Sequence, residues 1–164
     1  MKKIVSLNLN TKWGILLIIF FAGLLTIISY FKEHKKIKEQ EKKLSTKDKM
    51  KLYLNRFIHY NSSILIMFFP YIFEYDIIKY ILFIIYFIIV SISWSIYKEC
   101  PISIHEKQIL DNTYKFGDNA LYEPYTILIY NIKNDTEAYI IQSKIKNLFR
   151  FNACVILYRL FFLK

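Results

Sequence analysis

The chain of 164 residues is 55% hydrophobic and 18% aromatic, and it carries a formal net charge of +10. Its three glycines cannot form a glycine-rich phosphate-binding loop, and its two cysteines, Cys100 and Cys154, form neither a C-x-x-C pair nor a disulfide framework. Twenty lysines stand against three arginines, a ratio that A/T-rich codon usage also produces, and because nucleic-acid sites favour arginine we expect no nucleic-acid partner.

The first predicted element is a transmembrane helix at residues 13–31. These nineteen residues carry no charge and are bracketed by Lys12 and Lys32. At a rise of about 1.5 Å per residue they nearly span a hydrocarbon core of about 30 Å, and Trp13 and Tyr30 suit the two interfaces. The run is too long for the apolar part of a cleaved signal peptide, so we expect the helix to be retained.

A basic linker, residues 32–56, follows this helix with ten basic and four acidic residues. Glu39 and Lys43 have the i,i+4 spacing of a solvated helix, and Ser45 with Asp48 is typical of a new helix start. We interpret the linker as a cytoplasmic loop that follows the positive-inside rule. The alternative is contact with anionic lipids, at about 1 kcal/mol per basic residue near the surface.

Residues 57–97 are predicted to form a transmembrane helical hairpin with a polar turn at residues 74–79. Residues 80–97 are an uncharged apolar run, whereas residues 57–73 are shorter and contain Pro70. We expect Arg56, just before residues 57–73, to extend its side chain to the membrane interface. No ionisable residue lies in the two clear spans, which counts against an ion-coupled transporter.

Four polar residues of the hairpin are the candidates for a polar face: Asn61, Ser62, Ser91 and Ser95. Ser91 and Ser95 lie four positions apart and share one face, where a serine hydroxyl bonds back to its own helix or across to another. We interpret these residues as packing groups. The alternative is that they line a small oligomeric, holin-like pore.

Residues 98–164 are predicted to be a short membrane-associated region, interfacial or weakly membrane-spanning. Residues 137–150 fit a basic amphipathic helix, although residues 125–132 could instead pair with residues 139–142 as a β-hairpin. Residues 151–163 are apolar but contain Asn152 and Arg159, which suits an interfacial helix or a fourth span.

The stretch YKECPISIHE, residues 97–106, combines groups that suit chemistry with groups that suit a helix boundary. Pro101 cannot continue the preceding helix. Residues 103–106 match the capping box S-x-x-E, in which Ser103 and Glu106 each satisfy a backbone N–H. We therefore predict structural, helix-capping roles for Pro101, Ser103 and Glu106.

A metal or catalytic site in the same stretch would use Cys100, His105 and Glu106. Cys100 and His105 lie five positions apart and would diverge by about 140° on a helix, so one ion could not bind both without a break. We expect no metal, no cofactor and no catalytic residue.

The segment CPISIHE, residues 100–106, resembles the C-P-L-[ST]-x-x-E signature that follows a membrane helix in an uncharacterised family of small multi-pass bacterial membrane proteins. Similar E-C-P-[IL]-S stretches occur in small membrane proteins of large A/T-rich DNA viruses. Ile102 replaces the leucine, and Asp111 stands where a basic residue is expected. The resemblance implies a multi-pass membrane architecture and, because the family has no established activity, nothing about chemistry.

The sequence thus predicts an all-α integral membrane protein with three or four transmembrane helices. Its regions are residues 1–31 (tail and first helix), 32–56 (linker), 57–97 (hairpin) and 98–164 (C-terminal region). Linker and C-terminal region hold nineteen of the 23 basic residues, which favours an outside N-terminus and a cytoplasmic C-terminus. We expect a non-enzymatic protein of a virion or organelle membrane that contacts lipid, its own copies or other membrane proteins. The alternatives are the pore and a membrane-embedded enzyme using Cys100, His105 and Glu106.

Overall fold

The computed structural model describes residues 11–32, 35–97, 99–114 and 135–162, in which every regular element is a helix. The helices are α1 (Thr11–Lys32), α2 (Lys35–Lys42), α3 (Thr46–Ile72), α4 (Ile77–Tyr97), α5 (Pro101–Leu110) and α7 (Asp135–Phe162). The predicted all-α class is confirmed over these residues. The β-hairpin alternative is wrong for residues 139–142, which lie inside α7, while residues 125–132 lie outside the described residues.

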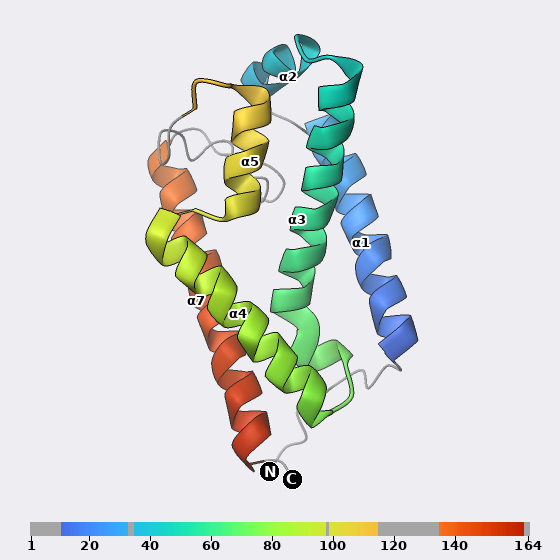
Figure 1. Ribbon diagram of the computed structural model, residues 1–164, viewed down its shortest axis with the longest axis vertical. Coiled ribbons are helices and arrows are strands. Elements are labelled where there is room, and N and C mark those ends of the chain that lie inside the picture. The colour runs from blue at the N-terminus through green and yellow to red at the C-terminus, as the bar shows by residue number, and fades with distance from the viewer. Residues whose placement is uncertain (1–10, 33–34, 98, 115–134, 163–164) are drawn as a thin grey trace.

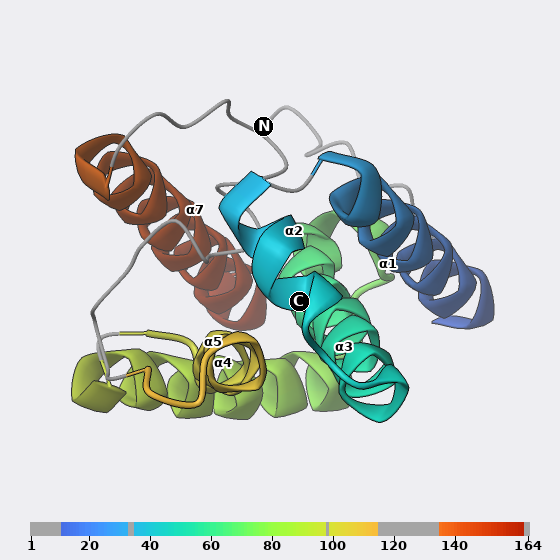
Figure 2. The same ribbon diagram turned by 90° about the horizontal axis from the view of Figure 1, so that it is seen from above.

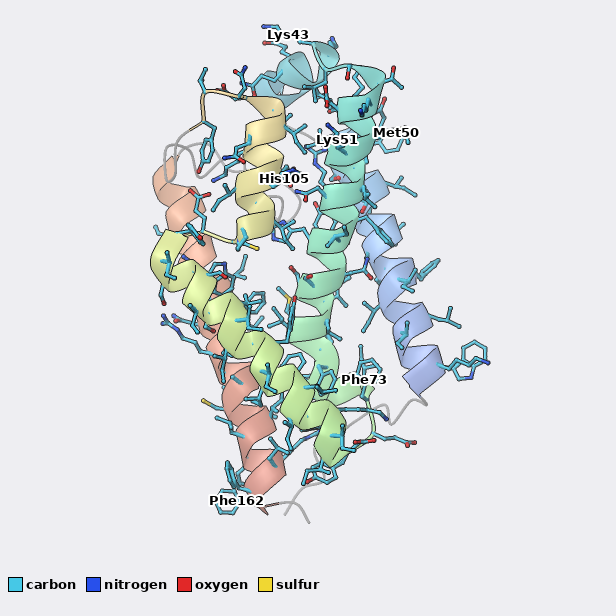
Figure 3. The ribbon with its side chains drawn as sticks, in the orientation of Figure 1. Lys43, Met50, Lys51, Phe73, His105 and Phe162 are labelled. Atoms are coloured by element: carbon cyan, nitrogen blue, oxygen red, sulfur yellow. The ribbon has the colours of Figure 1, made fainter. Side chains whose placement is uncertain are left out.

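Helix α3 is the centre of the arrangement. Figures 1 and 2 show α1 along one side of it and α4, α5 and α7 on the other side. Figure 3 shows Lys43 at one end of the molecule and Phe73 and Phe162 at the other. We call the end formed by α2 and the first turns of α3, residues 35–53, the basic end.

Helix α3 begins where the sequence predicts a helix start. Ser45 is the N-cap residue, and its hydroxyl oxygen accepts a hydrogen bond from the backbone N–H of Asp48 at 3.1 Å. The helix then continues for 27 residues without a break. The predicted linker and the first half of the predicted hairpin therefore share one helix. Arg56, which was expected to reach the interface, lies in the middle of α3 and is only 2% exposed.

A short polar turn joins α3 to α4, as predicted for a helical hairpin. Helix α3 ends with Phe73 as its C-cap, and Asp76 Oδ1 accepts hydrogen bonds from the backbone N–H groups of Ile78 at 3.0 Å and Lys79 at 3.2 Å. These bonds satisfy donors that the first turn of any helix leaves without intrahelical partners.

Helix α7 packs on α3 at the proline of α3. Pro70 has no N–H, so the carbonyl of Ile66 loses its usual helical partner. Asn152 Nδ2 donates to that carbonyl at 3.3 Å and to the carbonyl of Met67 at 2.6 Å, and Arg159 Nη1 donates to the carbonyl of Pro70. The two polar residues that weakened the prediction of a fourth span therefore face α3.

Two helices in the described part of the chain are long and apolar enough to cross a membrane. They are Lys12–Phe31 and Ile77–Tyr97, in α1 and α4, where the two clear spans were predicted. Within the fold, only 22% of the apolar stretch of α1 and 11% of that of α4 are buried. Helices α3 and α7 do not meet the same criterion of length and composition.

Candidate functional site

Helix α5 begins two residues before the serine that was predicted to cap it. Cys100 is the N-cap residue, its side chain makes no capping hydrogen bond, and Pro101 stands in the first turn. Proline is favoured there because its missing N–H has no intrahelical role at that position. Pro101 therefore stands at the boundary between two helices, where the sequence predicts it. The capping box is wrong, because Cys100 is the N-cap residue and Ser103 is the third residue of the helix.

Glu106 binds α3 instead of the backbone of its own helix. Its Oε1 atom lies 2.6 Å from Nε of Arg56, and the two side chains are 1% and 2% exposed. Beside this pair, Asn55 Nδ2 donates to the carbonyl of Ile102 at 2.8 Å. Nδ1 of His105 lies 3.2 Å from Asn55 Oδ1, on the side of α5 that faces α3 (Figure 3). Two consecutive residues of α3 thus hold the first half of α5.

A second buried ion pair connects α5 with the segments just before and just after it. Glu99, just before the helix, accepts a hydrogen bond from Lys107 Nζ at 2.7 Å and from the hydroxyl of Tyr114 at 2.6 Å. Lys107 Nζ also lies 3.2 Å from the Tyr114 hydroxyl, and the Lys107 side chain is 1% exposed. These three residues form a closed polar triangle that ties together the segments before and after α5.

The α3–α5 polar interface, defined as Asn55, Arg56 and Glu106, therefore contains one buried ion pair between the two helices. Glu99 and Lys107 form a second buried pair, which joins α5 to the segment just before it. Desolvation offsets much of the attraction in a buried pair, but removal of one partner typically costs about 3–5 kcal/mol because the other charge stays buried. Such an interface tolerates one arrangement of the two helices and penalises others. The observed role of this site is structural: its contacts hold α5 against α3.

A cavity of about 180 Å³ lies next to this interface, between α3, α4 and α5. The cavity is lined by His59, Ser62 and Ser63 from α3, by Ser93 from α4 and by Cys100, together with aliphatic and aromatic side chains. His59 is 3% exposed, whereas Cys100 is partly exposed and forms no disulfide. Ser93 is a site residue that the sequence analysis missed, because Ser91 and Ser95, which are four positions apart, share a helix face that does not include it.

The predicted polar face is not assembled as one surface. Of its four members only Ser62 lines the cavity. The Asn61 side chain donates to the carbonyl of Phe57 at 2.8 Å, and the Ser95 hydroxyl donates to the carbonyl of Ser91 at 3.0 Å. These back-bonds are one of the two outcomes expected for polar residues in apolar helices.

The three residues of the alternative catalytic site also have separate surroundings. Cys100 borders the cavity, His105 contacts Asn55, and Glu106 pairs with Arg56. Over the described ranges, no group of three or more His, Cys, Asp and Glu side chains is placed to hold a metal ion.

The chain matches no protein-family model, no curated protein and no solved structure. Its function is therefore inferred from its own residues and their geometry.

Proposed function

We propose that this chain is a multi-pass integral membrane protein that acts through packing and partner contacts in a bilayer. The observation that carries the proposal is the exposure of its two most apolar helices. In α4 the exposed large apolar residues include Ile78, Ile81, Leu82, Ile85, Ile88, Ile89, Ile92 and Ile96. A core helix of a water-soluble protein with this composition would be mostly covered by its own chain.

The free energy of covering these side chains supports a lipid environment. Full burial of one isoleucine or leucine is worth about 1.5–3 kcal/mol, and the exposed residues continue along α1, for example at Leu16, Ile19 and Ile27. Exposed apolar surface of this extent is typical of membrane or protein contact. Both helices also have the length of a hydrocarbon core.

We further propose that α3 and α7 lie in the membrane beside α1 and α4. Two polar side chains in the apolar second half of α7 face other helices. Asn152 binds carbonyls of α3, and Arg159 Nη1 donates to the Tyr80 hydroxyl at 2.9 Å as well as to α3. Polar side chains within a membrane usually turn to the bundle interior in this way. This gives four membrane helices, the larger of the two predicted numbers.

The proposed orientation places the basic end in the cytoplasm. Lys42, Lys43, Lys47, Lys49 and Lys51 gather there, as the positive-inside rule favours. With four helices the end of α7 lies outside, at the same end of the molecule as the start of α1 (Figure 1), because Phe162 and Lys43 are at opposite ends (Figure 3). The proposal keeps the N-terminus outside and replaces the cytoplasmic C-terminus of the three-helix prediction.

Two experiments test these statements separately. Alkaline carbonate should leave the protein in the membrane pellet, and release into the soluble fraction would end the proposal of integral insertion. A glycosylation acceptor inserted beside Lys43 should stay unmodified, while one inserted after Phe162 should be glycosylated. An unmodified acceptor after Phe162 would restore the three-helix topology.

The pore and the enzyme have less support as functions. Of the groups expected to line a pore, the Asn61 amide and the Ser95 hydroxyl bond to their own helices, and the residues of the alternative catalytic site have separate partners. Ion flux through liposomes that contain the purified protein should therefore equal that of empty liposomes. A flux lost on changing Ser62 to alanine would support the pore instead.

A further inference from the structure

A pocket of about 410 Å³ lies at the basic end, where the last turn of α1, helix α2 and the first turns of α3 meet. Figure 2 shows α2 between the ends of α1 and α3 when the molecule is viewed from above. Pockets that bind small ligands typically measure about 300–1,000 Å³. We infer that this pocket binds a phosphate ester, supplied by the headgroup of an anionic phospholipid.

Aromatic side chains form one wall of the pocket. The rings of Tyr30 and Tyr53 meet edge to face with centroids 5.8 Å apart, which joins α1 to α3, and Phe31 completes the wall. The hydroxyl of Tyr53 is buried and has no hydrogen-bond partner among the described residues. A buried donor without an acceptor is costly, and a phosphate oxygen in the pocket would be its acceptor.

Lysines line the pocket opposite this wall. Lys38 and Lys42 come from α2 and Lys49 comes from α3. Lys38 Nζ donates to the carbonyl of Phe31 at 3.0 Å, which uses one of its three N–H groups and leaves two for a ligand. With the carboxylate of Glu41, which also lines the pocket, three positive charges and one negative charge leave a net charge of +2.

The position of Glu41 narrows the class of ligand. Glu41 lines the pocket although the residue is only 6% exposed, and a carboxylate accepts hydrogen bonds only. A phosphate ester whose alcohol part carries hydroxyl groups would therefore bind the lysines through its phosphate and Glu41 through its hydroxyls. Glycerol and inositol headgroups have this chemistry.

The position of the pocket relative to the bilayer favours a lipid over a soluble ester. This step rests on the proposed membrane insertion. Helix α1 has 22 residues, or about 33 Å at 1.5 Å per residue, and a hydrocarbon core measures about 30 Å. Tyr30 and Phe31, at the last turn of α1, are 52% and 69% exposed. The pocket therefore opens where the phosphate groups of a bilayer begin.

The experiment is native mass spectrometry of the detergent-solubilised protein, titrated with short-chain phosphatidylglycerol. Short-chain phosphatidylcholine and sn-glycerol 3-phosphate are titrated in parallel. We expect one phosphatidylglycerol to bind first and more tightly than either other compound. The double variant Lys42→Gln/Lys49→Gln should weaken this first binding about tenfold or more. Tyr53→Phe, which removes only the hydroxyl, should weaken it about threefold or more.

The matched control is Lys43→Gln/Lys47→Gln, which removes the same charge from exposed neighbours outside the pocket. It should change the affinity by less than about twofold. Equal losses in both double variants would overturn the pocket, because they would show general attraction by the basic end. Equal binding of sn-glycerol 3-phosphate would overturn the lipid source and leave a phosphate-ester pocket. Absence of binding by a protein that stays in the carbonate pellet would defeat this inference without touching the proposed function.

Discussion

Nε of Arg56 lies 2.6 Å from Oε1 of Glu106, a residue fifty positions further along the chain, and both side chains are buried. The pair joins the middle of α3 to α5, the short helix that follows α4. It gives Glu106 a function that a capping carboxylate would not have, since a cap serves the backbone of its own helix. Three predictions about stability start from such long-range contacts, and a fourth starts from a local one.

The first prediction concerns Glu106→Gln. Glutamine keeps the size of the side chain but removes its charge, so Arg56 would stay buried without its ionic partner. We expect a loss of about 3–5 kcal/mol in stability, measured as a lower midpoint of thermal unfolding in detergent. In a capping box glutamine replaces glutamate with little loss, so a change below about 1 kcal/mol would contradict the ion pair.

Two further variants act as controls for this pair. Arg56→Met combined with Glu106→Leu removes both charges, and this double variant should recover most of the stability that the single variant loses. Ser103→Asp, which a true N-cap position would accept, should be destabilising because Ser103 is fully buried at 0% exposure. A neutral Ser103→Asp would argue for the capping box.

The second prediction concerns the contact of Asn152 with the helix around Pro70. Asn152→Ala would leave the carbonyl of Ile66 without its donor, and we expect a loss of about 1–3 kcal/mol. Pro70→Ala supplies a backbone N–H for that carbonyl, so the cost of Asn152→Ala should be smaller in this background. Asn147→Ala, at an exposed position of the same helix, should stay within about 0.5 kcal/mol. If the stability losses caused by Pro70→Ala and Asn152→Ala simply add in the double variant, Asn152 does not replace the donor that Pro70 lacks.

The third prediction compares two glycines of α1. A Cβ atom on Gly14 would lie 2.6 Å from Cε1 of Phe73, whereas one on Gly23 would have its nearest neighbour, Cε2 of Phe57, at 3.9 Å. Gly14→Ala should therefore destabilise the contact of α1 with the end of α3 by about 1–3 kcal/mol. Gly23→Ala meets no such obstacle and should stabilise the helix by up to about 1 kcal/mol. Thermal unfolding of the two variants in the same detergent checks the opposite signs.

The fourth prediction concerns pH and the N-cap of α3. The hydroxyl of Ser45, followed by the ammonium of Lys51, lowers the pKa of Asp48 below its ordinary value. A lowered pKa in the folded state means that the contribution of Asp48 is present above its unfolded pKa, about 3.9, and is lost as the pH falls through the lower folded value. Ser45→Ala should raise the pKa of Asp48, as followed by NMR of its carboxyl carbon. An unchanged pKa would show that the lysines alone set it.

The sequence by itself determined the elements whose signals lie within a few residues of one another. The two apolar helices follow from uninterrupted runs of about twenty apolar residues, the length and composition of a helix that can cross a membrane. The start of α3 at Ser45 and the turn at Asp76 follow from short side chains that bond to backbone N–H groups two or three positions later. Each of these signals needs no other part of the chain.

Only the tertiary structure decided the roles of the isolated polar residues. Arg56, Asn152 and Arg159 look like interruptions of apolar segments in the sequence, and Glu106 looks like half of a capping box. Their partners lie 50 to 89 positions away along the chain, so periodicity and spacing do not identify them. A buried charge or amide is tolerated only where another element supplies its counter-charge or acceptor, and that condition depends on how the helices pack.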